Sequence, residues 1–205
     1  PAPKTIFKNV FKVPSATSIS IKLDQLKLKN FDTFRDFCEQ DSVSLKEFWT
    51  LHEAKTLDVG IKYSDVKQKL NQKLTNAIKL QQLSDVPLGC FLSGGIDSTL
   101  IASLMSKANK DTKTFTIGFE FSEYDESIHA EKIAKYLKTD HKTVICSTKE
   151  TQEIIKSLSK AYTEPFADSS QIPTMMISKI ASQDVKVVLT GDCGDELFGG
   201  YNRYI

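Results

Sequence analysis

The sequence predicts an α/β fold: a parallel sheet with helices on both faces, preceded by a short β-rich extension. In residues 64–189, short apolar runs typical of buried strands alternate with longer segments of helical periodicity. Two glycine-rich turns each follow directly after an apolar run. In parallel α/β sheets, ligands bind at the loops that follow the strands. The order of elements and the place of the glycines therefore point to the same architecture.

Length and composition limit the class of protein. The 205 residues suit one domain, or one domain with an extension, and the net charge of +1 gives no broad attraction to nucleic acid. No apolar run approaches the ~20 residues of a membrane span. The four scattered cysteines form no metal-binding pattern and are expected to be reduced in the cytoplasm, with Cys90 and Cys146 in buried strands. We therefore expect small-molecule partners, with no nucleic acid and no membrane.

Residues 1–51 differ in character from the rest of the chain. Ser18–Leu23 alternates with the two-residue period of a half-buried strand, and Thr5–Val13 is predicted to be another strand. Residues 34–38 fit a short helix or a loop. We expect this segment to be the tail of a preceding domain plus a linker.

A helix is predicted over residues 64–83. Ser64 can cap it, and Asp65 favours its positive end. One face carries apolar residues at helical spacing, which predicts packing against a core. These residues are Val66, Leu70, Leu74, Ala77 and Ile78.

Strands and helices then alternate to the end of the chain. The predicted strands are 86–92, 113–119, 141–146 and 185–189. The predicted helices are 98–108, 126–137, 147–162 and 170–182. Ser147 and Glu150 have the spacing of a capping box. This rhythm predicts parallel strands joined by right-handed crossovers, with ligands beyond the carboxyl ends of the strands.

The first glycine-rich turn, Ser93–Ser98, is called the serine–glycine loop below. Its adjacent glycines let backbone amides approach an anion, and the start of the following helix adds a positive dipole end. Asp97 would repel phosphate unless it holds a Mg²⁺ ion that bridges to the phosphates. The turn lacks the lysine of a Walker A loop. The alternative is an ordinary turn with a serine cap.

The second glycine-rich turn, Thr190–Tyr201, is called the acidic loop below. It contains three acidic residues among four glycines, which is unsuited to a core element. If the strands before the two loops share one sheet, Asp97 and Asp195 can approach the same Mg²⁺ ion. The alternative is a solvated acidic turn.

These two loops carry a family resemblance. The serine–glycine loop resembles the pyrophosphate loop of N-type ATP pyrophosphatases. The acidic loop resembles the S-G-D-G-G-D-E-L-F-G-G-Y signature of glutamine-hydrolysing asparagine synthetases. Further matches are 116–120, 124–127, 139–141 and 164–174. The resemblance covers about residues 45–205 and implies an adenine nucleotide alpha hydrolase-like, Rossmann-like fold; residues 5–23 resemble more loosely the last strands of the family's glutaminase domain.

The resemblance implies ATP and Mg²⁺ as cofactors and assigns roles to residues. The adenine would contact Phe91, Leu92, Ile117 and Gly118. The pyrophosphate would contact Ser93, Gly94, Gly95, Asp97 and Ser98. Thr190 and Gly191 would lie against the nucleotide, Asp97 and Asp195 would hold the metal, and Asp192 would be catalytic. Glu164 and Asp168 would line the amino-acid side, with loop capping as the equal alternative.

The implied reaction is ATP-dependent amide formation, as in asparagine biosynthesis. The side-chain carboxylate of aspartate would be adenylated with release of pyrophosphate, and ammonia derived from glutamine would then displace AMP to give asparagine. Residues 1–51 would be the tail of a glutaminase-type domain plus linker, and 52–205 an incomplete synthetase domain. We expect a fragment, inactive alone, whose partners include the glutaminase domain of the same full-length chain and, as a candidate assembly, a second copy in a homodimer.

Two positions depart from the family pattern, and other functions stay open. Cys193 replaces the usual glycine, and Thr190 replaces the commoner serine. The three histidines, His52, His129 and His141, are expected to be structural or surface residues. The alternatives are an amidotransferase acting on a sugar acid or β-lactam precursor, a non-catalytic nucleotide-binding module, and a sulfur-transfer or tRNA-modifying pyrophosphatase. The near-neutral charge and the acidic loop argue against the last of these.

Overall fold

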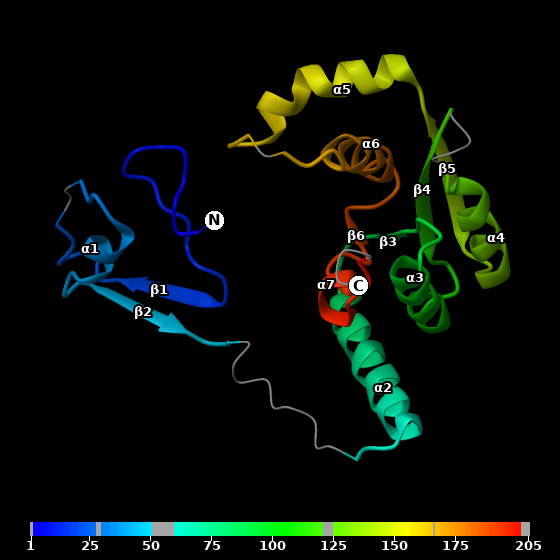
Figure 1. Cartoon of the computed structure of the whole chain (residues 1–205), viewed down its shortest axis with the longest axis horizontal. Helices are drawn as coiled ribbons and strands as arrows, with labels where there is room; N and C mark the ends of the chain where they lie inside the picture. Colours follow the sequence, from blue (N-terminus) through cyan, green and yellow to red (C-terminus); the bar gives the residue numbers. More distant parts are fainter. Residues whose placement is uncertain (1, 28–29, 51–59, 121–124, 166, 202–205) are drawn as a thin grey trace. The chain divides into compact units, whose positions relative to one another are not determined.

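The computed structural model describes residues 2–27, 30–50, 60–120, 125–165 and 167–201. The chain forms two compact units, Pro1–Ile61 and Lys62–Ile205, whose elements are labelled in Figure 1. The predicted boundary after residue 51 falls outside the described residues, as do His52, Tyr124 and Phe166.

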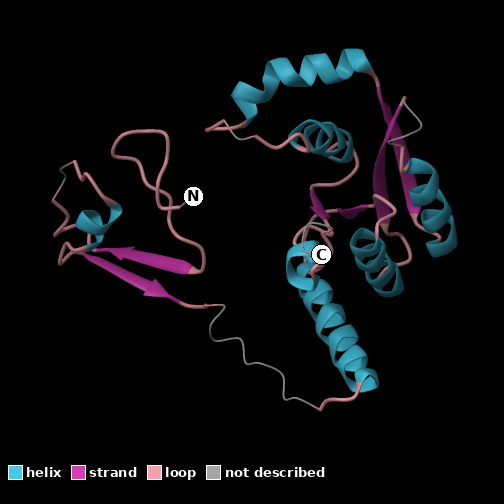
Figure 2. Ribbon diagram, viewed as in Figure 1, coloured by secondary structure: helices cyan, strands magenta, loops and turns pink. Residues whose placement is uncertain are grey.

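The first unit is built on a two-stranded antiparallel sheet. Strand β1 (Thr17–Ile21) pairs with β2 (Val43–Glu47), with Ile19 opposite Leu45, and the short helix α1 (Phe34–Cys38) lies between them in sequence. The strand predicted from the alternation at 18–23 is confirmed, and β2 was not predicted. Figure 2 shows the other described residues of this unit as loop.

Residues 5–13 form no strand, so that prediction was wrong. Lys4 and Phe11 make one isolated antiparallel bridge. The Thr5 hydroxyl donates to the Phe7 carbonyl oxygen over 3.0 Å, and its oxygen accepts from the Phe7 amide over 3.0 Å. These local side-chain bonds satisfy backbone groups that a strand would offer to a neighbour.

The second unit contains a four-stranded sheet in the order β5-β4-β3-β6, in which every pair is parallel. Its strands are β3 (Leu88–Phe91), β4 (Lys113–Phe119), β5 (Asp140–Cys146) and β6 (Val187–Leu189). The four predicted strands and their parallel pairing are confirmed. Because β3 and β6 are parallel neighbours, the loops that follow them leave the sheet at the same edge.

The helices of this unit occur where the sequence places them, apart from the last. They are α2 (Tyr63–Gln81), α3 (Ile96–Ala108), α4 (Ser127–Leu137), α5 (Thr148–Ala161), α6 (Gln171–Ala181) and α7 (Gly194–Phe198). The predicted capping box at the start of α5 is formed by Ser147 and Glu150. Helix α7, within the acidic loop, was not predicted. No helix of the described chain has both the length and the apolar character needed to cross a bilayer.

Helices cover both faces of the sheet. On one face, Cys90 packs in a buried cluster with Met105 of α3 and Ala130 of α4. On the other face, Phe91 packs with a cluster that contains Ile177 of α6. Successive residues of a strand point to opposite faces, so β3 contributes to both clusters. Figure 1 shows α6 and α4 on opposite sides of the β4–β5 pair, which confirms the predicted layers.

Helix α2 departs from the prediction in two details. Its cap position is Lys62, and the Ser64 hydroxyl donates to the Asp65 carboxylate instead of capping the helix. Of the predicted apolar face, Ile78 is buried and Leu74 packs beside the core, while Leu70 and Ala77 are exposed. The core contact is made by the C-terminal half of the helix, so its first turns extend into solvent.

The predicted buried thiols are confirmed. Cys90 and Cys146 are buried, and all four cysteines are free. Burial raises the pKa of the Cys90 thiol to about 12. This residue therefore packs as a small apolar side chain and stays protonated at neutral pH.

Candidate functional site

The serine–glycine loop is held by hydrogen bonds among its own residues. The Ser93 amide donates to Ser98 Oγ over 3.2 Å, and the two serine hydroxyls lie 2.9 Å apart. Ser93 Oγ also accepts from the Gly95 amide over 3.3 Å. The loop thus joins the end of β3 to the start of α3 in a defined conformation, with Gly95 at the cap position. A strand–loop–helix turn of this kind directs backbone N–H groups and a helix dipole at a bound anion.

The serine–glycine loop and the acidic loop are in contact. A Cβ placed on Gly191 would lie 2.7 Å from the Ser98 amide nitrogen and 3.0 Å from the Asp97 carbonyl carbon. A Cβ placed on Gly194 would overlap with the Asp97 carboxylate. Only glycine allows the two backbones to approach this closely. The structure therefore brings Asp97 against the acidic loop.

A cavity of about 630 Å³, called the loop cavity below, lies between the two loops. Nine of the predicted site residues line it: Phe91, Ser93, Gly95, Asp97, Ser98, Thr190, Gly191, Asp192 and Asp195. Sequence reasoning missed five other lining residues: Ile96, Thr174, Gly194, Phe198 and Gly200. Thr174 comes from α6, which lies outside both glycine-rich loops.

The charged side chains that line the loop cavity are three carboxylates, those of Asp97, Asp192 and Asp195, and none of its described lining residues is basic. The Thr190 hydroxyl donates to Asp192 Oδ2 over 2.8 Å and so orients that carboxylate. No group of three or more potential metal ligands occurs among the described residues. Mg²⁺ is often held by one or two carboxylates together with substrate phosphates and water. The donor set fits an ion that binds together with a phosphate ligand.

A second, apolar cavity of about 430 Å³, called the apolar cavity below, adjoins the first. It is lined by Phe91, Leu92, Ser93, Thr116, Ile117, Phe119, Glu126, Ser170, Pro173 and Ile177. Phe91 and Ser93 line both cavities, so the two are neighbouring parts of one cleft at the carboxyl ends of the strands. The Thr116 hydroxyl donates to the Leu92 carbonyl oxygen, which ties β3 to β4 at this point. A flat aromatic ring such as a purine, with apolar faces and polar edges, suits a cavity of this kind.

Two of the predicted nucleotide-contact residues lie beside the cleft without lining it. Gly94 has a φ of 86° and packs against α4, where a Cβ would lie 3.2 Å from the Ala130 amide nitrogen. Gly118 faces Ser127 and Ile145. Gly94 therefore shapes the turn, and Gly118 packs the end of β4 against its neighbours.

Glu164 and Asp168, the residues expected on the amino-acid side, do not line the loop cavity. Asp168 Oδ1 accepts a hydrogen bond from the Ser170 amide over 2.8 Å, just before α6. Hydrogen bonds from Ser170 lower the pKa of the Asp168 carboxyl. Glu164 lines a separate cavity of about 410 Å³ with residues of α5 and with Gln171. For Asp168 the structure shows the loop-capping alternative.

Cys193, which stands where the family resemblance expects glycine, is exposed and does not line the loop cavity. Its backbone is left-handed, with a φ of 70° and a ψ of 2°. An L side chain is unfavourable in this conformation, which glycine adopts freely. The thiol leaves the cavity open, and the cost of the substitution falls on the backbone.

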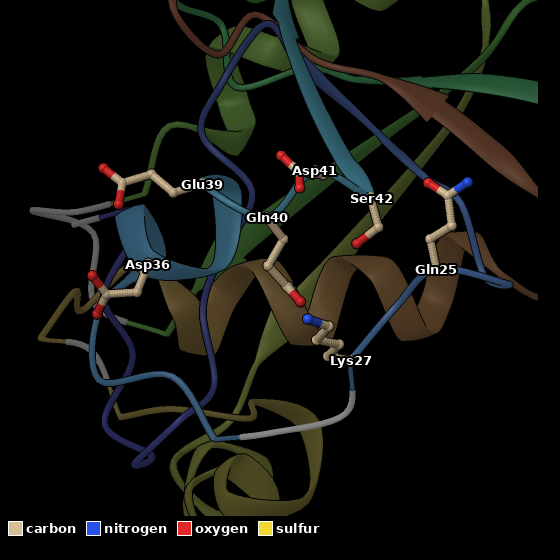
Figure 3. A pocket seen from close by; sticks show the side chains of 7 residues that line it. All are labelled: Gln25, Lys27, Asp36, Glu39, Gln40, Asp41 and Ser42. Atoms are coloured by element: carbon tan, nitrogen blue, oxygen red, sulfur yellow. The ribbon is translucent and has the colours of Figure 1, made fainter.

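The first unit contains a polar cavity of about 590 Å³ that carries none of the sequence motifs. Its lining residues are Gln25, Lys27, Asp36, Glu39, Gln40, Asp41 and Ser42. Figure 3 shows the Gln40 side chain extending toward Lys27, while the Glu39 carboxylate points away from both. Asp36 already accepts from the Thr33 amide in the capping box of α1. The cleft of the second unit, which eleven of the predicted site residues line, is the stronger candidate.

Comparison with known sequences decides the family. The sequence model of the asparagine synthase family matches residues 69–205, two thirds of the chain. The chain belongs to the asparagine synthase family. The resemblance inferred from the two loops is thereby confirmed.

Individual relatives in the asparagine synthase family are much longer than this chain. A putative glutamine-hydrolysing asparagine synthetase 2 of Methanocaldococcus jannaschii is 34% identical over 207 residues, covering 100% of this chain and 36% of the relative. Asparagine synthetase 1 of Bacillus subtilis is 32% identical over 157 residues, covering 77% of this chain and 25% of the relative. The chain thus spans about a third or less of these relatives. The solved NH3-dependent NAD synthetase of Campylobacter jejuni aligns with 66% of this chain and 60% of its own, at 22% identity and a TM-score of 0.47.

Proposed function

We propose that this chain is the nucleotide-binding core of a glutamine-hydrolysing asparagine synthetase, which binds ATP with Mg²⁺ and adenylates the side-chain carboxylate of aspartate. The observation that carries the proposal is the pair Asp97 and Asp195, which come from separate loops and line one cavity beside an apolar cavity. Membership of the asparagine synthase family supports the same reaction class.

In this proposal the nucleotide lies along the cleft. The adenine occupies the apolar cavity between Phe91 and Ile117, and the phosphates extend into the loop cavity. The serine–glycine loop offers backbone amides and the Ser93 hydroxyl to the phosphates. Asp97 and Asp195 hold the Mg²⁺ ion, which offsets the charge of the phosphates and of the departing pyrophosphate.

The chain's own residues then serve a two-step reaction. The carboxylate of aspartate attacks the α-phosphorus, the bond to the β-phosphate oxygen breaks, and pyrophosphate leaves. Ammonia attacks the acyl carbon of the resulting adenylate, AMP leaves with the electron pair of the broken C–O bond, and the nitrogen loses a proton. Asp192, oriented by the Thr190 hydroxyl at 2.8 Å, is placed in the loop cavity to accept that proton.

The rest of the enzyme is proposed to lie in parts of the protein outside this chain. The loop cavity has carboxylates but no basic side chain among its described lining residues, and substrate carboxylates need a positive partner. We assign residues 1–51 to the tail of a glutaminase-type domain that supplies ammonia from glutamine. The four free thiols fit a reducing, cytoplasmic environment.

The proposal is tested with the full-length protein, ATP, Mg²⁺, aspartate and either glutamine or ammonia. With aspartate carrying ¹⁸O in its side-chain carboxylate, we expect asparagine, pyrophosphate and AMP that contains one ¹⁸O atom. Asp192→Asn should retain ATP binding and lose asparagine formation. Cleavage of ATP to ADP and phosphate, or an amide formed only from a sugar acid or a β-lactam precursor, would contradict the proposal.

A further inference from the structure

One face of helix α6 runs along both parts of the cleft. Ser170, Pro173 and Ile177 line the apolar cavity, and Thr174 lines the loop cavity. These positions follow the i, i+3, i+4, i+7 spacing of a single helical face. Helix α6 is therefore the wall of the cleft opposite the end of β3, and Thr174 lies where the wall passes from the apolar cavity to the loop cavity.

The junction between the cavities has a defined position. Phe91 and Ser93 line both cavities from the sheet side, and Pro173 and Thr174 are consecutive residues that line one cavity each from the α6 side. A nucleotide with its base in one cavity and its β- and γ-phosphates in the other must cross this junction with its ribose and α-phosphate. The α-phosphate is the reacting group in the proposed adenylation.

Thr174 differs from the other hydroxyl residues of the loop cavity. The hydroxyls of Ser93 and Ser98 are hydrogen-bonded to one another, and the Thr190 hydroxyl donates to the Asp192 carboxylate. Thr174 is exposed to the cavity, and its hydroxyl has no hydrogen-bond partner within the described part of the chain. A neutral donor here adds affinity for an oxygen-rich ligand without adding to the negative charge of the three aspartates.

The position of Thr174 is fixed by the packing of its helix. Ile177 and Ala181 are buried against the sheet in a cluster with Phe115. Before the helix, Asp168 Oδ1 accepts from the Ser170 amide over 2.8 Å. The helix is thus held at both ends of the segment that faces the cleft, so a hydroxyl at position 174 is preorganised for a ligand.

We propose that Thr174 is a substrate-binding residue whose hydroxyl hydrogen-bonds the nucleotide at this junction, to a ribose hydroxyl or to an α-phosphate oxygen. The inference rests on the proposed function, because it assumes a nucleotide in the cleft. It adds a polar contact from α6 to the loop cavity, whose other polar side chains come from the two loops.

Calorimetric titration of the full-length protein with Mg²⁺-ATP, AMP, adenosine and adenine tests the inference. Thr174→Val removes the hydroxyl and keeps the shape, and should weaken Mg²⁺-ATP binding roughly three- to tenfold. Thr174→Ser should bind within about twofold of the unchanged protein, because it retains the donor. Thr75→Val, the same change on α2 away from both cavities, is the matched control. Thr174→Ala serves as the second variant should valine disturb folding.

The ligand series separates the outcomes. A loss for ATP and AMP but not for adenosine assigns the contact to the α-phosphate, and a loss that includes adenosine assigns it to the ribose. Equal ATP binding by the unchanged protein and Thr174→Val overturns the inference. A loss of adenine binding as large as the loss of ATP binding also overturns it, because adenine has neither ribose nor phosphate. Absence of Mg²⁺-ATP binding by the unchanged full-length protein would instead count against the proposed function.

Discussion

The carboxylate of Asp97 packs against the backbone of Gly194, so closely that a Cβ on Gly194 would overlap with Asp97 Oδ2. The first residue of α7 thus sets the position of a side chain that belongs to α3. Two segments about 100 residues apart in sequence are joined at one point of the cleft. The proposed metal site depends on this contact.

Gly194→Ala should displace the Asp97 carboxylate with little loss of stability, because the displaced atoms are the end of a flexible side chain. The expected result is a drop in Mg²⁺-ATP affinity of about tenfold or more, measured by calorimetry. Combined with Asp97→Asn, the alanine change should cost nothing further, since both act on the same carboxylate. Full additivity of the two losses would show that Gly194 acts elsewhere.

Gly191→Ala should instead lower the free energy of unfolding by about 1–3 kcal/mol. Its Cβ would lie 2.7 Å from the Ser98 amide nitrogen, which is backbone and cannot rotate away. Urea denaturation measures the change. Gly95→Ala is the matched control, because its Cβ would meet only Ser93 Oγ at 3.3 Å. Equal losses for the two variants would contradict the close approach of the loops.

Cys193→Gly should stabilise the protein by about 0.5–1 kcal/mol, because glycine adopts the left-handed conformation found there without a Cβ clash. The gain is reduced by the greater freedom of glycine in the unfolded chain. Cys193→Ala, which removes the thiol and keeps the Cβ, should give no gain. If Cys193→Ala stabilised the protein as much as Cys193→Gly, the destabilising group would be the sulfur and not the left-handed backbone.

Stability should fall as the pH is lowered from 7.5 to 5.5, because His141 is half buried and burial lowers its pKa. The negative charge of Glu131 raises the pKa of His141, but this effect is smaller than that of burial. The imidazole contacts the hydroxyls of Thr114 and Thr143, at 2.8 and 3.2 Å, and Thr143 in turn donates to Glu131.

The direction follows from linkage. The unfolded chain takes up a proton near pH 6.5, whereas the folded chain does so only at lower pH, so acid favours unfolding in this window. His141→Gln should make the free energy of unfolding nearly independent of pH between 7.5 and 5.5 in urea titrations. The carboxyls of Asp125, Glu150 and Asp168 have lowered pKa values, and their contribution to stability is lost only below this window, from about pH 4 downward. A pH slope unchanged in the variant would rule out His141 as its source.

The sequence was most informative where local pattern and tertiary packing agree. The capping box at Ser147 and Glu150 and the apolar run at 113–119 each depend on neighbouring residues only, and both were found. The approach of Asp97 to the acidic loop could also be predicted, on the condition that the strands before the two loops share one sheet. It follows from the strand order, because β3 and β6 are parallel neighbours.

Features that depend on three-dimensional placement were missed. Helix α7 is five residues long and lies among glycines, so it has no periodic signal. Thr174 reaches the cleft because α6 runs beside the two loops; its segment, 164–174, matches the family pattern, but that match alone did not mark Thr174 as a ligand contact. Ser64 has the residue type of a cap, but the helix begins one residue earlier, and its hydroxyl bonds to Asp65 instead.

The central claim, that Asp97 and Asp195 hold one metal ion together with the phosphates of ATP, is tested most directly by Mn²⁺ binding measured by electron paramagnetic resonance. The account predicts one tightly bound Mn²⁺ per chain in the presence of ATP and little without it. Asp97→Asn and Asp195→Asn should each weaken that binding about tenfold or more, and the double variant should lose less than the sum, as expected for shared ligands. Mn²⁺ binding that persists unchanged in Asp195→Asn would contradict the account.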